Sequence, residues 1–177
     1  DSRRYLEFAN DRYALAKAIE TYQYEYGIGY PQEERPAGRP AKASPNYGRL
    51  KAKGAKFGAR GGWERAVYFA KPGDTGGTDT SFRRCHWHEA VKRECEAVEQ
   101  RAAVLDLPGF TKFEVTGPGA GAWIDGMITG VLPKEGRTAL NYFLAPSGGI
   151  VTEMTVTNLG HGKYWLISAA SGERHDL

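Results

Sequence analysis

Alternating apolar and polar residues, interrupted by glycine and proline turns, run through the second half of this 177-residue chain. A period of two is typical of β-strands, and we expect strands around Phe113, at 138–144, at 150–156 and at 164–170. The turns between them are short, which favours antiparallel neighbours. The sequence therefore predicts an α+β fold, an antiparallel sheet accompanied by helices, and not a doubly wound parallel sheet.

Helical spacing appears in three places. Apolar residues recur at this spacing from Phe8 to Tyr26 and precede Gly27, which predicts an amphipathic helix over residues ~5–26. A second helix is expected where four residues share one buried face: His88, Val91, Cys95 and Val98. A short third helix is expected around Trp123.

Proline and glycine set the domain organisation. Periodicity disappears between Tyr30 and Gly62, where four prolines predict an extended, wrapping segment, and 71–80 reads as a linker. A linker there would separate a helical and extended first part of the chain from a second part rich in expected strands. The first residue is not Met and the last residues resemble the first turn of a helix, so we expect a piece of a longer polypeptide, cut at both ends.

Composition excludes several classes of protein. No apolar run approaches the roughly 20 residues of a membrane span, and no signal peptide opens the chain. A net charge of +3 does not indicate a nucleic-acid partner. Two cysteines are too few for a disulfide framework, which indicates a reducing compartment: bacterial cytoplasm, or the mitochondrial matrix in a eukaryote.

Three motifs have a chemical and a structural interpretation. Cys85, His86, His88 and Cys95 offer zinc ligands, but their spacing fits no zinc motif and we interpret Cys95 as a buried hydrophobe, so no metal site is expected. The basic strip from Arg39 to Arg60, with Tyr47 and Phe57 as stacking rings, suits nucleic acid, a solvated surface or an acidic neighbouring domain. The glycine-rich segment 117–121 lacks the pattern of a phosphate loop, and Pro118 removes a backbone donor.

Glu153 is a lone carboxylate on its expected strand. Ile150, Met154 and Val156 form the apolar face of that strand, so Glu153 lies on the other face with Val151 and Thr155. A solvated carboxylate and a functional one are both compatible with this pattern.

Segments throughout the chain resemble the dimethylglycine and sarcosine dehydrogenase family. The segments that carry the resemblance, in chain order, are 24–27, 29–31, 33–40, 62–65, 81–84 with Trp87 and Glu89, 102–107, 110–115, 148–150, 153–157 and 173–177. Members of this family combine an FAD-binding domain, which oxidises an N-methyl amine, a central domain, and a domain similar to glycine-cleavage aminomethyltransferase. The resemblance implies that 1–75 belongs to the central domain and 80–177 to the first part of the folate-binding domain.

The same resemblance implies cofactors and a site. FAD would be held by a domain outside this chain, since no Gly-x-Gly-x-x-Gly motif is present, and that domain would be its partner. Tetrahydrofolate would capture the one-carbon unit beside Glu153, the expected catalytic residue, with Leu140, Tyr142 and Thr155 as further folate-binding residues. The isolated chain is expected to be inactive.

Two positions depart from the family pattern. Related transferases carry a tyrosine at the position of Leu140, for which Tyr142 could substitute, and an asparagine at the position of Gly130. Two alternatives therefore stay open: a non-catalytic regulatory subunit of the pyruvate dehydrogenase phosphatase type, and a stand-alone folate-binding module. Neither the N-methyl amine nor the electron acceptor of the parent enzyme follows from this sequence.

Overall fold

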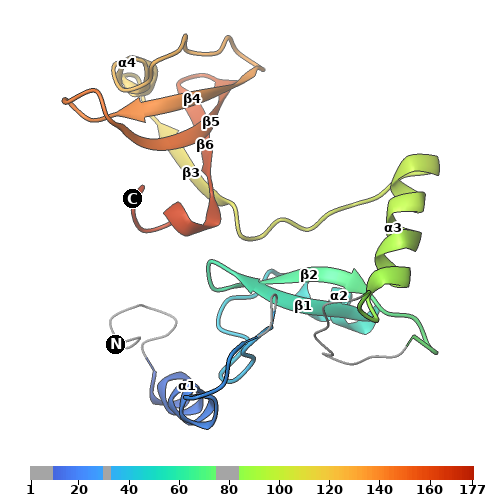
Figure 1. Cartoon of the computed structure of the whole chain (residues 1–177). Helices are drawn as coiled ribbons and strands as arrows, with labels where there is room; N and C mark the ends of the chain where they lie inside the picture. Colours follow the sequence, from blue (N-terminus) through green and yellow to red (C-terminus); the bar gives the residue numbers. More distant parts are fainter. Residues whose placement is uncertain (1–9, 30–32, 75–83) are drawn as a thin grey trace. The chain divides into compact units, whose positions relative to one another are not determined.

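The computed structural model describes residues 10–29, 33–74 and 84–177 and forms two compact units, Asp1–Pro108 and Gly109–Leu177 (Figure 1). Each unit is described by itself. The domain boundary expected at 75–80 falls on residues outside the described ranges, so it stays a prediction.

The first unit is built around a β-hairpin. Its elements are α1 (Asp11–Gln23), α2 (Tyr47–Ala52), β1 (Ala55–Arg60), β2 (Trp63–Phe69) and α3 (His88–Gln100). Strands β1 and β2 are antiparallel and turn at Gly61 and Gly62, whose φ angles of 56° and 83° suit glycine. Sequence analysis expected only an extended segment up to Gly62, so this hairpin corrects that expectation.

Helix α1 is shorter than predicted and turns its apolar face outward. It starts at its cap Asn10, whose side chain accepts a hydrogen bond from the Tyr13 nitrogen at 2.7 Å. Glu20 is buried, binds Lys17 at 2.7 Å and accepts from the Ala37 nitrogen at 2.9 Å, while Lys17 also donates to the Arg35 carbonyl. The side toward the rest of the unit therefore carries this ion pair beside the half-buried Tyr13 and Ala16.

Arg39 does not contribute an exposed charge to the basic strip, because it forms a buried ion pair. Its guanidinium binds both carboxylate oxygens of Glu64 at 2.8 and 2.9 Å, and it also reaches Glu34 at 2.9 Å. Glu64 is 3% exposed and Arg39 13% exposed, so this contact joins two of the segments that carry the family resemblance. Tyr47 and Phe57 pack against each other with ring centroids 4.5 Å apart instead of forming open stacking platforms.

Helix α3 confirms the predicted helix but not its predicted buried face. Ala90 is its buried residue, and Glu94 accepts a hydrogen bond of 2.7 Å from the Phe69 nitrogen of β2. Cys95 and Val98, expected to be buried, are exposed. The interpretation of Cys95 as a buried hydrophobe was therefore wrong.

The second unit contains a four-stranded antiparallel sheet of order β3-β6-β5-β4. Its elements are β3 (Thr111–Thr116), α4 (Ala120–Asp125), β4 (Thr138–Leu144), β5 (Ile150–Gly160), β6 (Lys163–Ser168) and the 3₁₀ turn η3 (Ala170–Gly172). The predicted α+β fold with an antiparallel sheet is confirmed.

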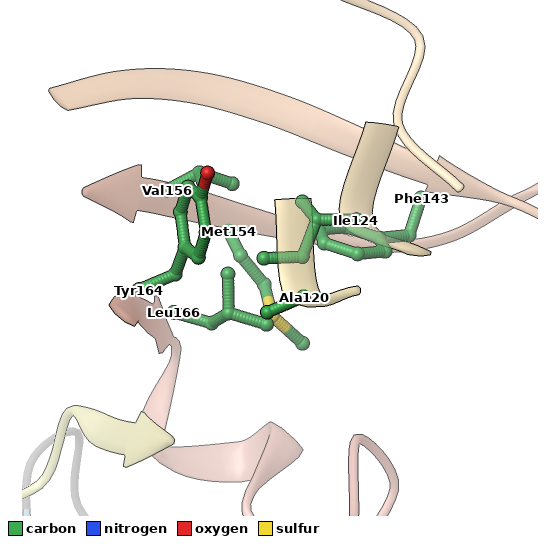
Figure 2. Packing of buried hydrophobic residues seen from close by; sticks show 7 residues of the cluster. All are labelled: Ala120, Ile124, Phe143, Met154, Val156, Tyr164 and Leu166. Carbon is green, nitrogen blue, oxygen red and sulfur yellow. The ribbon is translucent and has the colours of Figure 1, made fainter. Parts of the chain in front are cut away.

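One face of this sheet carries the core, with α4 packed against it (Figure 2). Ile124 and Val156 have no exposed surface, and the core is completed by five further residues: Ala120, Phe143, Met154, Tyr164 and Leu166. Gly121 lies under Tyr164, whose hydroxyl would be 2.7 Å from a Cβ atom there. This contact gives the glycine-rich segment 117–121 a packing role.

A β-bulge changes the expected side of Ile150. Phe143 pairs with Thr152 but Leu144 pairs with Ile150, which leaves Val151 as an extra residue. Met154 and Val156 are buried as predicted, whereas Ile150 is exposed. The opposite face of the sheet, which we call the open face, carries Leu140, Tyr142 and Trp165, all exposed.

Candidate functional site

The candidate site lies on the open face where β4 pairs with β5. Leu140 stands directly opposite Thr155, and Tyr142 stands opposite Glu153. Side chains of directly opposite residues on one face are neighbours, so the four predicted site residues form two adjacent cross-strand pairs. Met154 and Asn141, between them along the strands, point to the buried face.

Tyr142 and Glu153 also interact through their side chains. A side-chain hydrogen bond to Glu153, together with the negative charge of that carboxylate and partial burial, raises the pKa of the Tyr142 hydroxyl. The hydroxyl therefore donates and the carboxylate accepts. Glu153 is exposed, so its carboxylate remains accessible from solvent.

A hollow of about 550 Å³ opens beside these pairs. Its walls come from the residue before β3, from β4 and β5, and from the end of β6 with the segment that follows: Phe110, Leu140, Val151, Thr152, Glu153, Thr155, Ile167, Ser168, Ala169, Gly172, His175 and Asp176. The hollow combines apolar walls with two carboxylates and an imidazole. Its size falls within the range of about 300–1,000 Å³ that is usual for small-molecule sites.

The second carboxylate of the hollow, Asp176, is buried. Its side chain is 1% exposed, and Oδ1 lies 2.9 Å from Nδ1 of His175. Burial alone would raise the pKa of Asp176, but His175 and the hydroxyls of Ser168 and Thr152 outweigh this effect and lower it. Asp176 is therefore ionised at neutral pH.

A third carboxylate on the open face lies away from the hollow. Glu114 accepts a hydrogen bond of 3.0 Å from the Trp165 indole nitrogen and binds Lys163 at 2.8 Å. The Lys163 and Trp165 hydrogen bonds lower the pKa of Glu114. This carboxylate is already engaged within the sheet.

The structure brings together most of the predicted site residues and adds others. Leu140, Glu153 and Thr155 line the hollow, and Tyr142 reaches it through Glu153. Sequence analysis missed His175 and Asp176, although both lie in a segment that carried the family resemblance. Only the turn η3 reveals them, because it brings the chain from β6 back to the first residues of β5.

The other candidate motifs do not assemble a site. Within 10–29, 33–74 and 84–177, no three side chains of His, Cys, Asp and Glu are grouped as metal ligands would be. His86 instead meets the Tyr68 hydroxyl at 3.0 Å. Among the described helices, none has both the length and the apolar character that a membrane crossing requires.

Comparison with known proteins identifies the fold of the site. The family model described as the GCVT N-terminal domain matches residues 46–177. The chain belongs to the GCVT N-terminal domain family. A second family model, the FAD dependent oxidoreductase central domain, matches residues 1–44 ahead of this GCVT N-terminal domain.

Two curated relatives confirm the resemblance expected from the sequence. Human mitochondrial dimethylglycine dehydrogenase is 39% identical over 178 residues, which is all of this chain and 20% of that enzyme. Human mitochondrial sarcosine dehydrogenase is 27% identical over 186 residues, covering 90% of this chain and 20% of its own length. The chain thus spans about a fifth of the length of these curated relatives.

A solved structure supports the GCVT-type fold. The glycine cleavage system aminomethyltransferase T from Bartonella henselae superimposes with a TM-score of 0.56 at 23% identity, covering 76% of this chain and 33% of that chain. This likeness confirms the predicted relation to the aminomethyltransferase fold.

Proposed function

We propose that this chain is the folate-facing portion of an FAD-linked N-methyl amine dehydrogenase or oxidase, in which it receives the one-carbon unit on tetrahydrofolate. The observation that carries the proposal is Glu153, an exposed carboxylate held by Tyr142 at the edge of a hollow on the open face. The two relatives described above, which match 100% and 90% of the chain, are named as dehydrogenases of dimethylglycine and sarcosine, and this supports the substrate class.

The hollow has features that suit a folate. Leu140, Ile167 and Phe110 provide apolar surface for flat aromatic rings. Glu153, Thr155 and the Tyr142 hydroxyl provide polar groups that can bind ring nitrogens and their protons. This combination of apolar walls and few placed polar groups is usual for cofactor-sized ligands.

Glu153 has a chemical role in this proposal. When an iminium cation from amine oxidation meets a folate nitrogen, positive charge and an N–H proton must be accommodated. A carboxylate lowers the energy of the cation and can accept the proton, an effect typically worth 10²–10⁴-fold in rate. Tyr142, which lies opposite Glu153 on β4, would orient that carboxylate. It would thereby take the role of the tyrosine that the family resemblance implies at the position of Leu140.

FAD would be bound elsewhere in the polypeptide. Every strand pairing within the sheets of the described residues is antiparallel, so they contain no βαβ unit of the kind that holds a dinucleotide. No step of the proposal therefore passes through a flavin bound to this chain.

The outward face of α1 fits a further part of the same polypeptide. Leu15, Ile19 and Tyr22 are 64%, 52% and 79% exposed, whereas Lys17 and Glu20 face the unit. An amphipathic helix with this orientation leaves its apolar side for another surface. We assign that surface to the FAD-binding domain, because the matched relatives are about five times longer than this chain.

Product analysis of the full-length enzyme tests the function. Oxidation of dimethylglycine or sarcosine should release formaldehyde without tetrahydrofolate and should form 5,10-methylenetetrahydrofolate with it. A full-length protein that oxidises neither amine would instead favour the regulatory-subunit alternative. Binding of tetrahydrofolate by the 177-residue chain alone would favour the stand-alone module.

A further inference from the structure

The His175–Asp176 pair has the arrangement of a proton-transfer group and its orienting partner. His175 lines the hollow and is 60% exposed, whereas Asp176 is 1% exposed behind it. Because an ionised carboxylate only accepts, Nδ1–H of His175 donates to Oδ1 of Asp176 across 2.9 Å. This bond leaves Nε2 of the neutral ring without a proton and able to accept one.

Asp176 is held in place by the turn and the neighbouring strands. Its backbone nitrogen donates to the Gly172 carbonyl at 2.8 Å, which closes the turn after η3. The hydroxyls of Ser168, on β6, and Thr152, on β5, approach the carboxylate closely enough to stabilise its charge. Within the described residues, Oδ2 of Asp176 and Oγ of Ser168 nevertheless lack a partner of full hydrogen-bond geometry. These two atoms, in residues that line the hollow, can therefore form further hydrogen bonds.

We infer that His175 is a second catalytic residue of the proposed one-carbon transfer, a proton carrier at the hollow, and that Asp176 is the residue that positions it. This inference rests on the proposed function. Glu153 and His175 both line the hollow, so one group can stabilise the cation while the other moves the proton. A buried carboxylate that fixes one ring nitrogen while the other faces the ligand is the recurring means of orienting a catalytic histidine.

The assigned step balances in atoms and charge. The iminium carbon forms a bond to one folate nitrogen, whose N–H proton passes to Nε2 of His175. His175 returns this proton to the amine nitrogen while the bond from that nitrogen to the transferred carbon breaks, and the electron pair leaves with the amine. The second folate nitrogen then bonds to the carbon and releases its own proton to solvent. Iminium cation and tetrahydrofolate thus give methylenetetrahydrofolate, a neutral amine and one proton.

Replacement and chemical rescue in the full-length enzyme test the inference. His175→Ala should leave amine oxidation intact and lower methylenetetrahydrofolate formation by about 10²-fold, with formaldehyde released instead. Added imidazole should restore most of the loss, because His175 is exposed enough for a free ring to replace it. His161→Asn, which changes an exposed histidine in the β5–β6 turn, should have no effect. Asp176→Asn should lower kcat for methylenetetrahydrofolate formation at an unchanged KM for tetrahydrofolate.

A footprint independent of turnover separates this inference from the proposed function. Diethyl pyrocarbonate should carbethoxylate His175, and saturating tetrahydrofolate should slow this reaction severalfold while that of His161 is unchanged. Unaltered methylenetetrahydrofolate formation by His175→Ala, a loss that imidazole does not restore, or a His175 that folate leaves unprotected would each overturn the inference. Release of formaldehyde alone by the unsubstituted enzyme would contradict the proposed function instead.

Discussion

The backbone nitrogen of Gly130 donates a hydrogen bond of 3.1 Å to Oδ1 of Asn141, and a Cβ atom at position 130 would lie 2.4 Å from that oxygen. Asn141 is buried, at 2% exposure, so its amide has little room to withdraw. The amide from β4 therefore occupies the space that a side chain at position 130 would enter. This contact would account for a glycine where the family resemblance implies an asparagine.

Gly130→Asn should destabilise the fold by about 1–3 kcal/mol, because the new Cβ atom would collide with the buried amide of Asn141. The pair Gly130→Asn with Asn141→Ser should recover part of the loss, since the shorter side chain vacates the contested space. Denaturant midpoints of the wild type, both single variants and the pair give the coupling energy. Additive effects of the two substitutions would contradict the steric explanation.

Gly162 and Gly136 allow the cost of a strained backbone to be distinguished from the cost of a steric clash. Their φ angles are 71° and 73°. A Cβ atom added at Gly162 would lie 2.7 Å from the Gly117 carbonyl oxygen, whereas a Cβ atom added at Gly136 would have no neighbouring atom within 4 Å. Gly136→Ala should cost about 1–2 kcal/mol from the left-handed backbone alone. Gly162→Ala should cost clearly more, and equal losses in chemical denaturation would show that the backbone contact does not matter.

Glu20 makes stability depend on pH in a defined direction. Burial alone would raise the pKa of Glu20, but Lys17 and the Ala37 nitrogen outweigh burial and lower it below the usual 4.5. Its folded pKa is depressed, so its contribution is complete above the unfolded value and is lost as pH falls through the folded value. Glu20→Gln should therefore destabilise by about 1.5–3 kcal/mol at pH 7. This difference should shrink on acidification, and a constant difference would contradict the assignment.

The sheet of the second unit could be predicted from the sequence because its strands alternate apolar and polar residues, and because glycine and proline turns mark where those strands end. The hairpin β1–β2 was missed although Gly61 and Gly62 supply a turn signal, since Gly58 and Ala59 weaken the alternation before it. Periodicity indicated which residues of α3 share a face but not which face is covered, so Cys95 was misplaced. The His175–Asp176 pair depends on a tertiary turn, which no local pattern encodes.

The outward face of α1 should matter only when the FAD-binding domain is present. In the full-length protein, Ile19→Ser should lower the unfolding temperature measurably, because it removes apolar area from a docked surface. Thr21→Ser, an exposed position on the opposite side of the helix, should change stability by no more than about 0.5 kcal/mol. Equal and negligible effects of the two substitutions would show that α1 remains in solvent.

The product distribution of Glu153→Gln in the full-length enzyme tests the central claim most directly. The substitution keeps the size of the side chain and removes its charge, so amine oxidation should continue while methylenetetrahydrofolate formation falls by about 10²–10⁴-fold and formaldehyde is released instead. Glu114→Gln, on the same open face but outside the hollow, is the matched control and should leave the distribution unchanged. An unchanged ratio of formaldehyde to methylenetetrahydrofolate in Glu153→Gln would contradict the account.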